Sequence, residues 1–116
     1  MNKPTQGSVV LVDFTYSNQV QSKVRPALVM SNSRYNSLSR HVIVMKITSR
    51  KPKMMAVSLK NEDLKAGILD YPSYVQVDGI YALEKELISD TIGIVRLKKM
   101  QEIRNLVSSL FSAADE

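Results

Sequence analysis

The chain contains no cysteine and only one histidine, His41. Without thiols it can form neither a disulfide bond nor a thiolate metal site. A single imidazole argues against a zinc site, because such sites draw on several His or Cys ligands. It also excludes an acid–base pair of two histidines. His41 begins an apolar run, which favours a strand-end residue over a catalyst. We therefore expect neither a metal nor a cofactor.

Glycine and long apolar runs are scarce as well. The four glycines are scattered at positions 7, 67, 79 and 93, so the chain has no Gly-rich phosphate loop. No apolar run approaches the ~20 residues of a membrane span. The run Val9–Val12 meets Asp13, which is unlike a signal peptide. Ser31 and Ser49 lack a His-Asp partner set, which disfavours a serine hydrolase. We expect a cytoplasmic protein without a membrane segment.

What the chain does have is a basic but otherwise ordinary globular composition. Of its 116 residues 44% are hydrophobic and 23% charged, and 16 Lys and Arg against 11 Asp and Glu give a net charge of +5. Length and uniform composition predict a single domain, residues 1–116. A small basic domain favours an anionic partner such as nucleic acid. On charge alone, a basic domain without such a partner is nearly as compatible.

Short runs rich in β-branched residues dominate the first 95 positions. They predict strands over 8–14, 25–31, 42–48, 55–59, 74–83 (bent near Gly79) and 91–95. A polar loop is expected over 15–24, a polar connector over 32–40, and one helical turn or a wide loop over 61–67. Apolar residues at helical spacing predict an amphipathic helix over 97–111 that packs on the sheet. The fold class is mainly β with a C-terminal helix, a small half-open barrel or curled antiparallel sheet.

The strands 25–31 and 42–48 flank the polar connector and are expected to pair as a hairpin. If Ser31 lies opposite Val42, the numbers of opposed residues add to 73, so Arg25 lies opposite Thr48. Directly opposed residues share a sheet face, with Cβ atoms about 5 Å apart. One face of this hairpin is wholly apolar and is predicted to be core. The other face, which carries Arg25 and Thr48, is mixed and is predicted to be a surface.

A cation beside a hydroxyl at the end of a rigid hairpin is a plausible anion site. Arginine keeps its charge and can grip two phosphate oxygens with its planar fork of donors. Pro26 biases Arg25 towards an extended backbone, and the β-branch of Thr48 stiffens χ1. The alternative is that Arg25 pairs with a carboxylate, Asp13 or Asp78, while Thr48 only ends a strand. The residues alone slightly favour this alternative.

Several stretches, in this order and spacing, resemble the MazF/PemK family of toxins from bacterial toxin–antitoxin systems. The matching segments are GSVVLVDF (7–14), KVRPALVMS (23–31), Tyr35-Asn36, ITS (47–49) and VQVDGI (75–80). The resemblance extends over about residues 7 to 111. It implies an SH3-like half-open barrel of the MazF/PemK/CcdB type with a C-terminal helix, and a homodimer.

The resemblance also implies an activity: metal-independent, sequence-specific cleavage of single-stranded RNA, including mRNA, which inhibits translation and growth. The ribose 2′-OH attacks the adjacent phosphate, so the protein supplies no nucleophile and has only to orient the phosphate and stabilise its charge. The implied partners are RNA and a cognate antitoxin whose disordered acidic tail wraps the dimer. Operator DNA is reached only through the antitoxin.

Residue by residue, the resemblance makes Arg25 and Thr48 catalytic. Asp78 is a candidate base or RNA contact, together with Gln76 and Ser49, although an ordinary solvated carboxylate is the more economical interpretation of Asp78. The 16–23 loop is expected to contact RNA by charge and stacking, a plain flexible loop being equally compatible. The loop residues named for this role are Tyr16, Asn18, Gln19 and Lys23.

The later strand departs from the family pattern. Gln76 stands where some members carry a catalytic Arg, and Gly79 and Tyr81 stand where many have Gln and Arg. These substitutions bear on base recognition and leave Arg25 and Thr48 in place. Two other functions stay open. One is a non-catalytic toxin on the same fold that binds a protein such as DNA gyrase, and the other is a basic RNA- or DNA-binding barrel.

Overall fold

The computed structural model describes residues 4–15 and 22–113. Within them the strands are β1 (Ser8–Thr15), β2 (Ser22–Val29), β3 (His41–Thr48), β4 (Ala56–Leu59), β5 (Leu64–Gly67), β6 (Ser73–Glu84) and β7 (Ile88–Val95). The helices are α1 (Ser33–Leu38) and α2 (Leu97–Leu110), with short 3-10 turns η1 (Asn61–Asp63) and η2 (Lys85–Leu87). The predicted mainly β fold with a C-terminal helix is confirmed.

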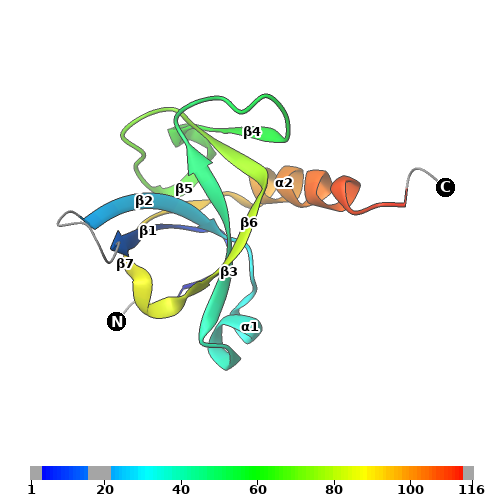
Figure 1. Cartoon of the computed structure of the whole chain (residues 1–116). Helices are drawn as coiled ribbons and strands as arrows, with labels where there is room; N and C mark the ends of the chain where they lie inside the picture. The colour runs from blue at the N-terminus through cyan, green and yellow to red at the C-terminus, as the bar shows by residue number, and fades with distance from the viewer. Residues whose placement is uncertain (1–3, 16–21, 114–116) are drawn as a thin grey trace.

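All seven strands belong to one antiparallel sheet with the order β4-β6-β3-β2-β1-β7-β5. The sheet curls strongly, so that β1, β2, β3, β6 and β7 close most of a barrel while β4 and β5 lie at its upper rim in the view of Figure 1. The predicted half-open barrel is therefore present. None of the described helices is long and apolar enough to cross a membrane.

Both faces of the sheet bury apolar side chains. The first cluster includes Leu28, Met45 and Ile47 together with residues of β4, β5 and α2, as the hairpin pattern predicts. The second cluster fills the other face. Its buried members are Val10, Val12, Ala27, Val29, Val42, Val44 and Leu83. The prediction of a surface on this face is wrong for the middle of the hairpin, because a curled sheet also encloses its concave side.

Two segments differ from the sequence prediction. The connector after β2 contains helix α1, whose N-cap residue Asn32 accepts a hydrogen bond from the Tyr35 backbone N–H at 2.9 Å. At 61–67, where one helical turn or a wide loop is expected, a single 3-10 turn over 61–63 is present and strand β5 follows it. Gly67 permits this close pairing with β7. Its φ is +86°, and a Cβ there would lie 2.0 Å from the carbonyl oxygen of Ile92.

Helix α2 packs on the sheet with only part of its apolar stripe. Met100 and Ile103 are fully buried in the first cluster, whereas Leu110 and Phe111 at the far end are exposed. Figure 1 shows the helix projecting beyond the barrel. The predicted helix is confirmed, and its packing on the sheet is confirmed from Met100 to Val107, because Leu106 and Val107 also pack against the first cluster.

Candidate functional site

The predicted hairpin register is confirmed, but its last predicted pair is not formed as a ladder pair. The β2–β3 partners are Ala27–Lys46, Leu28–Met45 and Val29–Val44, whose numbers add to 73 as predicted. The ladder ends there, two residues short of Arg25 and Thr48. In Figure 1 the two strands spread apart towards this end. Arg25 instead pairs with Val12 of β1.

Pro26 explains why the ladder ends. The Met30 backbone N–H donates to the Ile43 carbonyl at 2.8 Å, so even-numbered residues of β2 point their backbone polar groups towards β3. Pro26 is therefore the residue that should donate to Ile47, and proline has no N–H. Without that hydrogen bond, β2 and β3 are free to separate just where the two predicted site residues lie.

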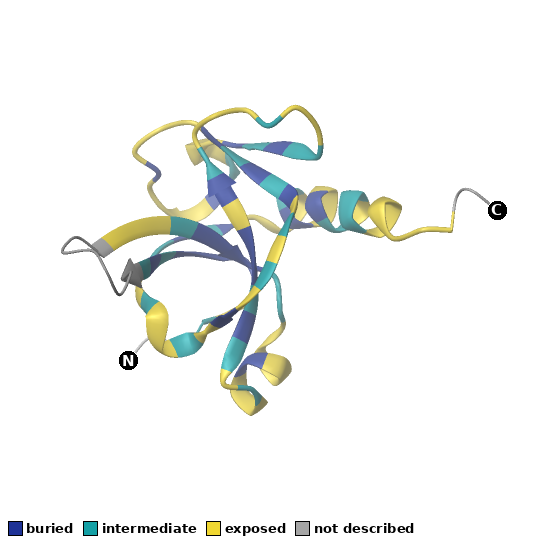
Figure 2. Cartoon of the chain, in the orientation of Figure 1, coloured by how far each residue is buried: buried dark blue, intermediate teal, exposed yellow. Residues whose placement is uncertain are grey.

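Arg25 and Thr48 nevertheless share one face of the sheet. Arg25 is opposed to Val12, a member of the second cluster, so its side chain lies on the face of that cluster. Side chains alternate between faces along a strand, so Thr48 lies on the same face as Lys46 and the cluster member Val44. Here the cluster has ended and the face is open. Arg25 is exposed and Thr48 is half-buried. Figure 2 shows the change along β2, from an exposed start to a buried end.

Two rows of side chains cross this open end of the sheet. In the first, Thr48 of β3 is opposed to Tyr74 of β6, which is opposed to Ser58 of β4. In the second, Lys46 is opposed to Gln76, which is opposed to Ala56. Arg25 and Ala27 continue the two rows into β2. We refer to Arg25, Lys46, Thr48, Ser58, Tyr74 and Gln76 as the polar row residues.

The local turn after β3 orients the Thr48 hydroxyl. Its Oγ1 accepts a hydrogen bond from the Arg50 backbone N–H at 3.1 Å. A hydroxyl oxygen that already accepts one bond still has its proton to donate, and the β-branch holds the group in place. Thr48 is therefore a donor aimed from a fixed position. Ser49, the next residue, is exposed and lies outside the strand.

Positive charge gathers around this face. Arg25, Lys46 and Arg50 are exposed, as are Lys51 and Lys53 of the β3–β4 loop. The ion pairs found within the described residues join Lys99 of α2 to Asp63 and Glu102, and none involves these five cations. The expected alternative, in which Arg25 is neutralised by Asp13 or Asp78, is thus not found there. An unpaired guanidinium among other cations suits a phosphate.

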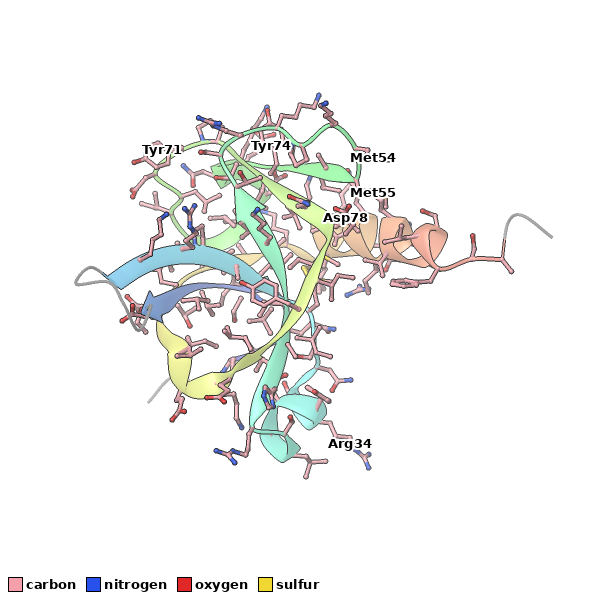
Figure 3. The ribbon with its side chains drawn as sticks, viewed as in Figure 1. Arg34, Met54, Met55, Tyr71, Tyr74 and Asp78 are labelled. Carbon is pink, nitrogen blue, oxygen red and sulfur yellow. The ribbon has the colours of Figure 1, made fainter. Side chains whose placement is uncertain are left out.

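A three-residue bulge in β6 separates Asp78 from Thr48. The β3–β6 register shifts between Met45, opposed to Ile80, and Lys46, opposed to Gln76. Asp78 lies on this bulge, between the residues opposed to Lys46 and Met45, whereas Thr48 is opposed to Tyr74, four residues earlier in the chain. In Figure 3 it is labelled at the side nearest α2. Gln76, in contrast, is one of the polar row residues.

Gly79 and Tyr81, which depart from the residues expected from the family resemblance, have clear local roles. A Cβ at Gly79 would lie 3.0 Å from the Cβ of Lys46, so a larger residue would have to push that side chain aside. Tyr81 is opposed to Val44 and packs against the second cluster. Burial raises the pKa of the Tyr81 phenol, which keeps the group protonated at neutral pH.

Of the predicted RNA-contacting loop, only Lys23 can be placed. It is exposed on β2, two residues from Arg25. Tyr16, Asn18 and Gln19 lie outside the described residues. Lys46, Tyr74 and Ser58 are not among the predicted site residues. The two-residue alternation of β3 already places Lys46 on the face of Thr48, but Tyr74 and Ser58 depend on a register that only the bulged strand reveals.

A separate hollow lies at the opposite end of the barrel. Its volume is about 530 Å³, and Pro4, Ser33, Arg34 and Lys85 are among its lining residues. A hydrogen bond connects α1 and η2 at this hollow, since the Lys85 Nζ donates to the Asn36 carbonyl at 2.7 Å. Figure 3 shows Arg34 at this lower end and Tyr74 at the upper end, so the hollow is distinct from the polar row residues.

The fold and the arginine–threonine site can now be compared with known proteins. Residues 5–111 match the family described as PemK-like, MazF-like toxin of type II toxin–antitoxin system. The chain is 27% identical over 103 residues to the endoribonuclease MazF of Staphylococcus saprophyticus, covering 88% of this chain and 86% of that protein.

Solved structures agree with the family match. A mycobacterial endoribonuclease in complex with its cognate antitoxin is 25% identical, with a TM-score of 0.73 over 94% of this chain and 93% of that one. MazF in a MazE–MazF crystal from Deinococcus radiodurans shares the fold, with a TM-score of 0.77, 24% identity and coverage of 94% and 96%. The chain belongs to the PemK-like, MazF-like toxin family of type II toxin–antitoxin systems.

Proposed function

We propose that this toxin is a sequence-specific, metal-independent endoribonuclease that cleaves single-stranded RNA, mRNA included, with Arg25 and Thr48 at the reacting phosphate. The observation that carries the proposal is that one open face of the sheet presents both an exposed arginine, free of ion pairs among the described residues, and a threonine whose Oγ1 is already held as an acceptor. Surrounding cations draw in a polyanion and make its binding salt-dependent.

The chemistry requires little from the protein. The 2′-oxygen forms a bond to the adjacent phosphorus, the bond from phosphorus to the 5′-oxygen breaks, and a cyclic phosphate and a free 5′-OH result. Arg25 binds the non-bridging oxygens as negative charge builds up on them and donates a proton to the leaving oxygen. Thr48 donates a hydrogen bond to a phosphate oxygen. Both groups act by position and electrostatics, and neither forms a bond to the RNA; Arg25 regains its proton from the solvent that takes the 2′-OH proton.

The group that accepts the 2′-OH proton is not among the strongest candidates in the sequence. Asp78 is not assigned as the base beside Thr48, because the bulge that carries it lies between the levels of Lys46 and Met45, outside the row of Thr48 and Tyr74. Gln76 cannot accept a proton at neutral pH, so its role is to contact RNA. Ser49 stays a prediction as an RNA contact. Solvent water fits the open face and serves as the acceptor.

The same cations suit the proposed protein partner. A cognate antitoxin with an acidic disordered tail would lie across Arg25, Lys46 and Arg50 and block RNA from the polar row residues. The proposal includes a homodimer, contact with operator DNA only through the antitoxin, and growth arrest when the toxin is free. The relatives crystallised with their antitoxins support an antitoxin as the protein partner.

The test is cleavage of RNA by protein kept in EDTA, with mapping of the new 5′ ends. Arg25→Ala should lower the cleavage rate about 10²- to 10³-fold, as loss of a preorganised donor does. Arg25→Lys keeps the charge but loses the planar fork of donors, so its cleavage rate should lie between those of the parent and Arg25→Ala. The matched control is Arg34→Ala at the opposite end of the barrel, which should cleave like the parent.

Other outcomes would assign a different function. Full activity of a folded Arg25→Ala variant would remove Arg25 from the site. Intact RNA with salt-dependent binding would identify a basic nucleic-acid-binding barrel. Intact RNA without such binding would leave a toxin that acts on a protein such as DNA gyrase.

A further inference from the structure

Tyr74 occupies a special place among the tyrosines of the barrel. It is opposed to Thr48 across the β3–β6 ladder, so the two side chains share a face with Cβ atoms about 5 Å apart. Its neighbours on that strand, Ser73 and Val75, are buried on the other side. The Tyr74 ring therefore stands beside the proposed phosphate contact, on the open face.

The Tyr74 ring is not a member of the hydrophobic core, and no hydrogen bond of its hydroxyl is found within the described residues. Tyr74 is half-buried and belongs to neither hydrophobic cluster, unlike Tyr81, which packs against the second. Within the described residues, its hydroxyl has no hydrogen-bond partner among the bonds found. The exposed part of an aromatic ring at the open end of a barrel is available to a ligand.

The neighbours leave room for a planar ligand. On either side across the sheet, Tyr74 faces small residues, Thr48 on β3 and Ser58 on β4. No bulky side chain stands directly opposite it to cover the ring. Lys46 and Gln76 form the adjacent row, so a charged group and an amide lie next to the aromatic surface. Figure 3 shows Tyr74 at the upper end of the barrel, with Tyr71 in the loop before it.

We propose that the Tyr74 ring is a stacking platform for the nucleobase next to the scissile phosphate. This inference rests on the proposed function and names a positioning residue for it. Aromatic side chains on sheet surfaces stack unpaired bases of single-stranded RNA, and each stack contributes to affinity whatever the base. A base held on Tyr74 fixes the nucleotide whose phosphate lies beside Thr48.

The test compares Tyr74→Ala and Tyr74→Phe on a short RNA whose cleavage position has been mapped, and on RNAs made abasic at each nucleotide flanking that position. Tyr74→Ala should lower kcat/KM about 5- to 150-fold on the intact RNA, which is the usual range for one lost stack, mainly through KM. On the abasic RNA that lacks the stacked base, Tyr74→Ala should change kcat/KM less than twofold. Tyr74→Phe keeps the ring and should act like the parent, as should Tyr35→Ala on helix α1.

Two results would overturn the inference. Equal losses for Tyr74→Ala on intact and abasic RNA would show a structural effect, and a Phe variant as weak as the Ala variant would place the role in the hydroxyl. Stacking can also be measured without cleavage, by the quenching of 2-aminopurine fluorescence. The 2-aminopurine stands at the flanking position of an RNA whose cleavage site is 2′-deoxy and therefore lacks the attacking hydroxyl. If the parent protein cleaves no RNA, the proposed function fails. Quenching that Tyr74→Ala does not reduce refutes the platform separately.

Discussion

Replacement of Thr48 by valine is the sharpest test of the geometry at the end of β3. Valine keeps the β-branch and nearly the same volume, so the exchange removes only the hydroxyl. In the parent, the Arg50 N–H occupies one side of Oγ1 at 3.1 Å, and the proton is left for a phosphate oxygen. The exchange therefore deletes one preorganised donor and one turn hydrogen bond.

The two losses have different sizes. A donor of this kind contributes about 10²- to 10³-fold to kcat, and the open, half-buried position of Thr48 places the expected loss near 10²-fold. The turn hydrogen bond contributes about 1 kcal/mol to stability, which lowers Tm by about 4 °C in a domain of this size. Thr48→Val should thus be a folded protein with little activity.

The assay measures single-turnover cleavage of a defined RNA and thermal unfolding of the same samples. Thr48→Ser is the matched control, since it restores the hydroxyl on a less rigid side chain and should recover activity to within about tenfold of the parent. The reasoning is refuted if Thr48→Val, with its Tm near that of the parent, cleaves within threefold of it. Failure of Thr48→Ser to recover activity would show that the methyl group matters instead.

Two further predictions concern stability. Asn36→Ala should cost about 3 kcal/mol, or about 10 °C in Tm, because Asn36 is buried and its side chain binds the Ser31 hydroxyl, the Ser31 carbonyl at 3.0 Å and the Pro4 carbonyl at 3.1 Å. A loss under 1 kcal/mol in urea unfolding would contradict this. Tyr81 has its pKa raised above the usual 10.0 by burial, so the unfolded chain ionises first and stability falls as pH rises past 10. Tyr81→Phe should flatten that fall between pH 9 and 11, and an unchanged slope would contradict it.

Local sequence patterns were sufficient for most of the strands. The β2–β3 register follows from placing Ser31 opposite Val42. The apolar pattern supports this register, because it puts Leu28 and Met45 together on the face that forms the core. Helix α2 follows equally from its apolar spacing. These elements are determined by neighbours close in the chain, so a single sequence contains the information that specifies them.

Longer-range features could not be read in the same way. Ala27, Val29 and Val44 looked like part of a surface because the sequence does not show that the sheet curls over its second face. The row of Thr48, Tyr74 and Ser58 depends on a bulge that shifts β6 by three residues against β3. A bulge has no strong sequence mark beyond Gly79, so the aromatic member of the site could not be placed.

Pro26 connects the local and the long-range parts of the site. From the sequence, its effect is to extend the backbone at Arg25. In the barrel it also removes the hydrogen bond that would bring Ile47 and β3 against β2 at this level. A continuous ladder would hold the Arg25 and Thr48 side chains about 5 Å apart at Cβ, in contact with each other. Because the ladder ends two residues earlier, at Ala27 and Lys46, the strands spread (Figure 1). We propose that this spread makes room for a phosphate between guanidinium and hydroxyl. On this proposal the Arg-Pro dipeptide supplies both the cation and the space in which it acts.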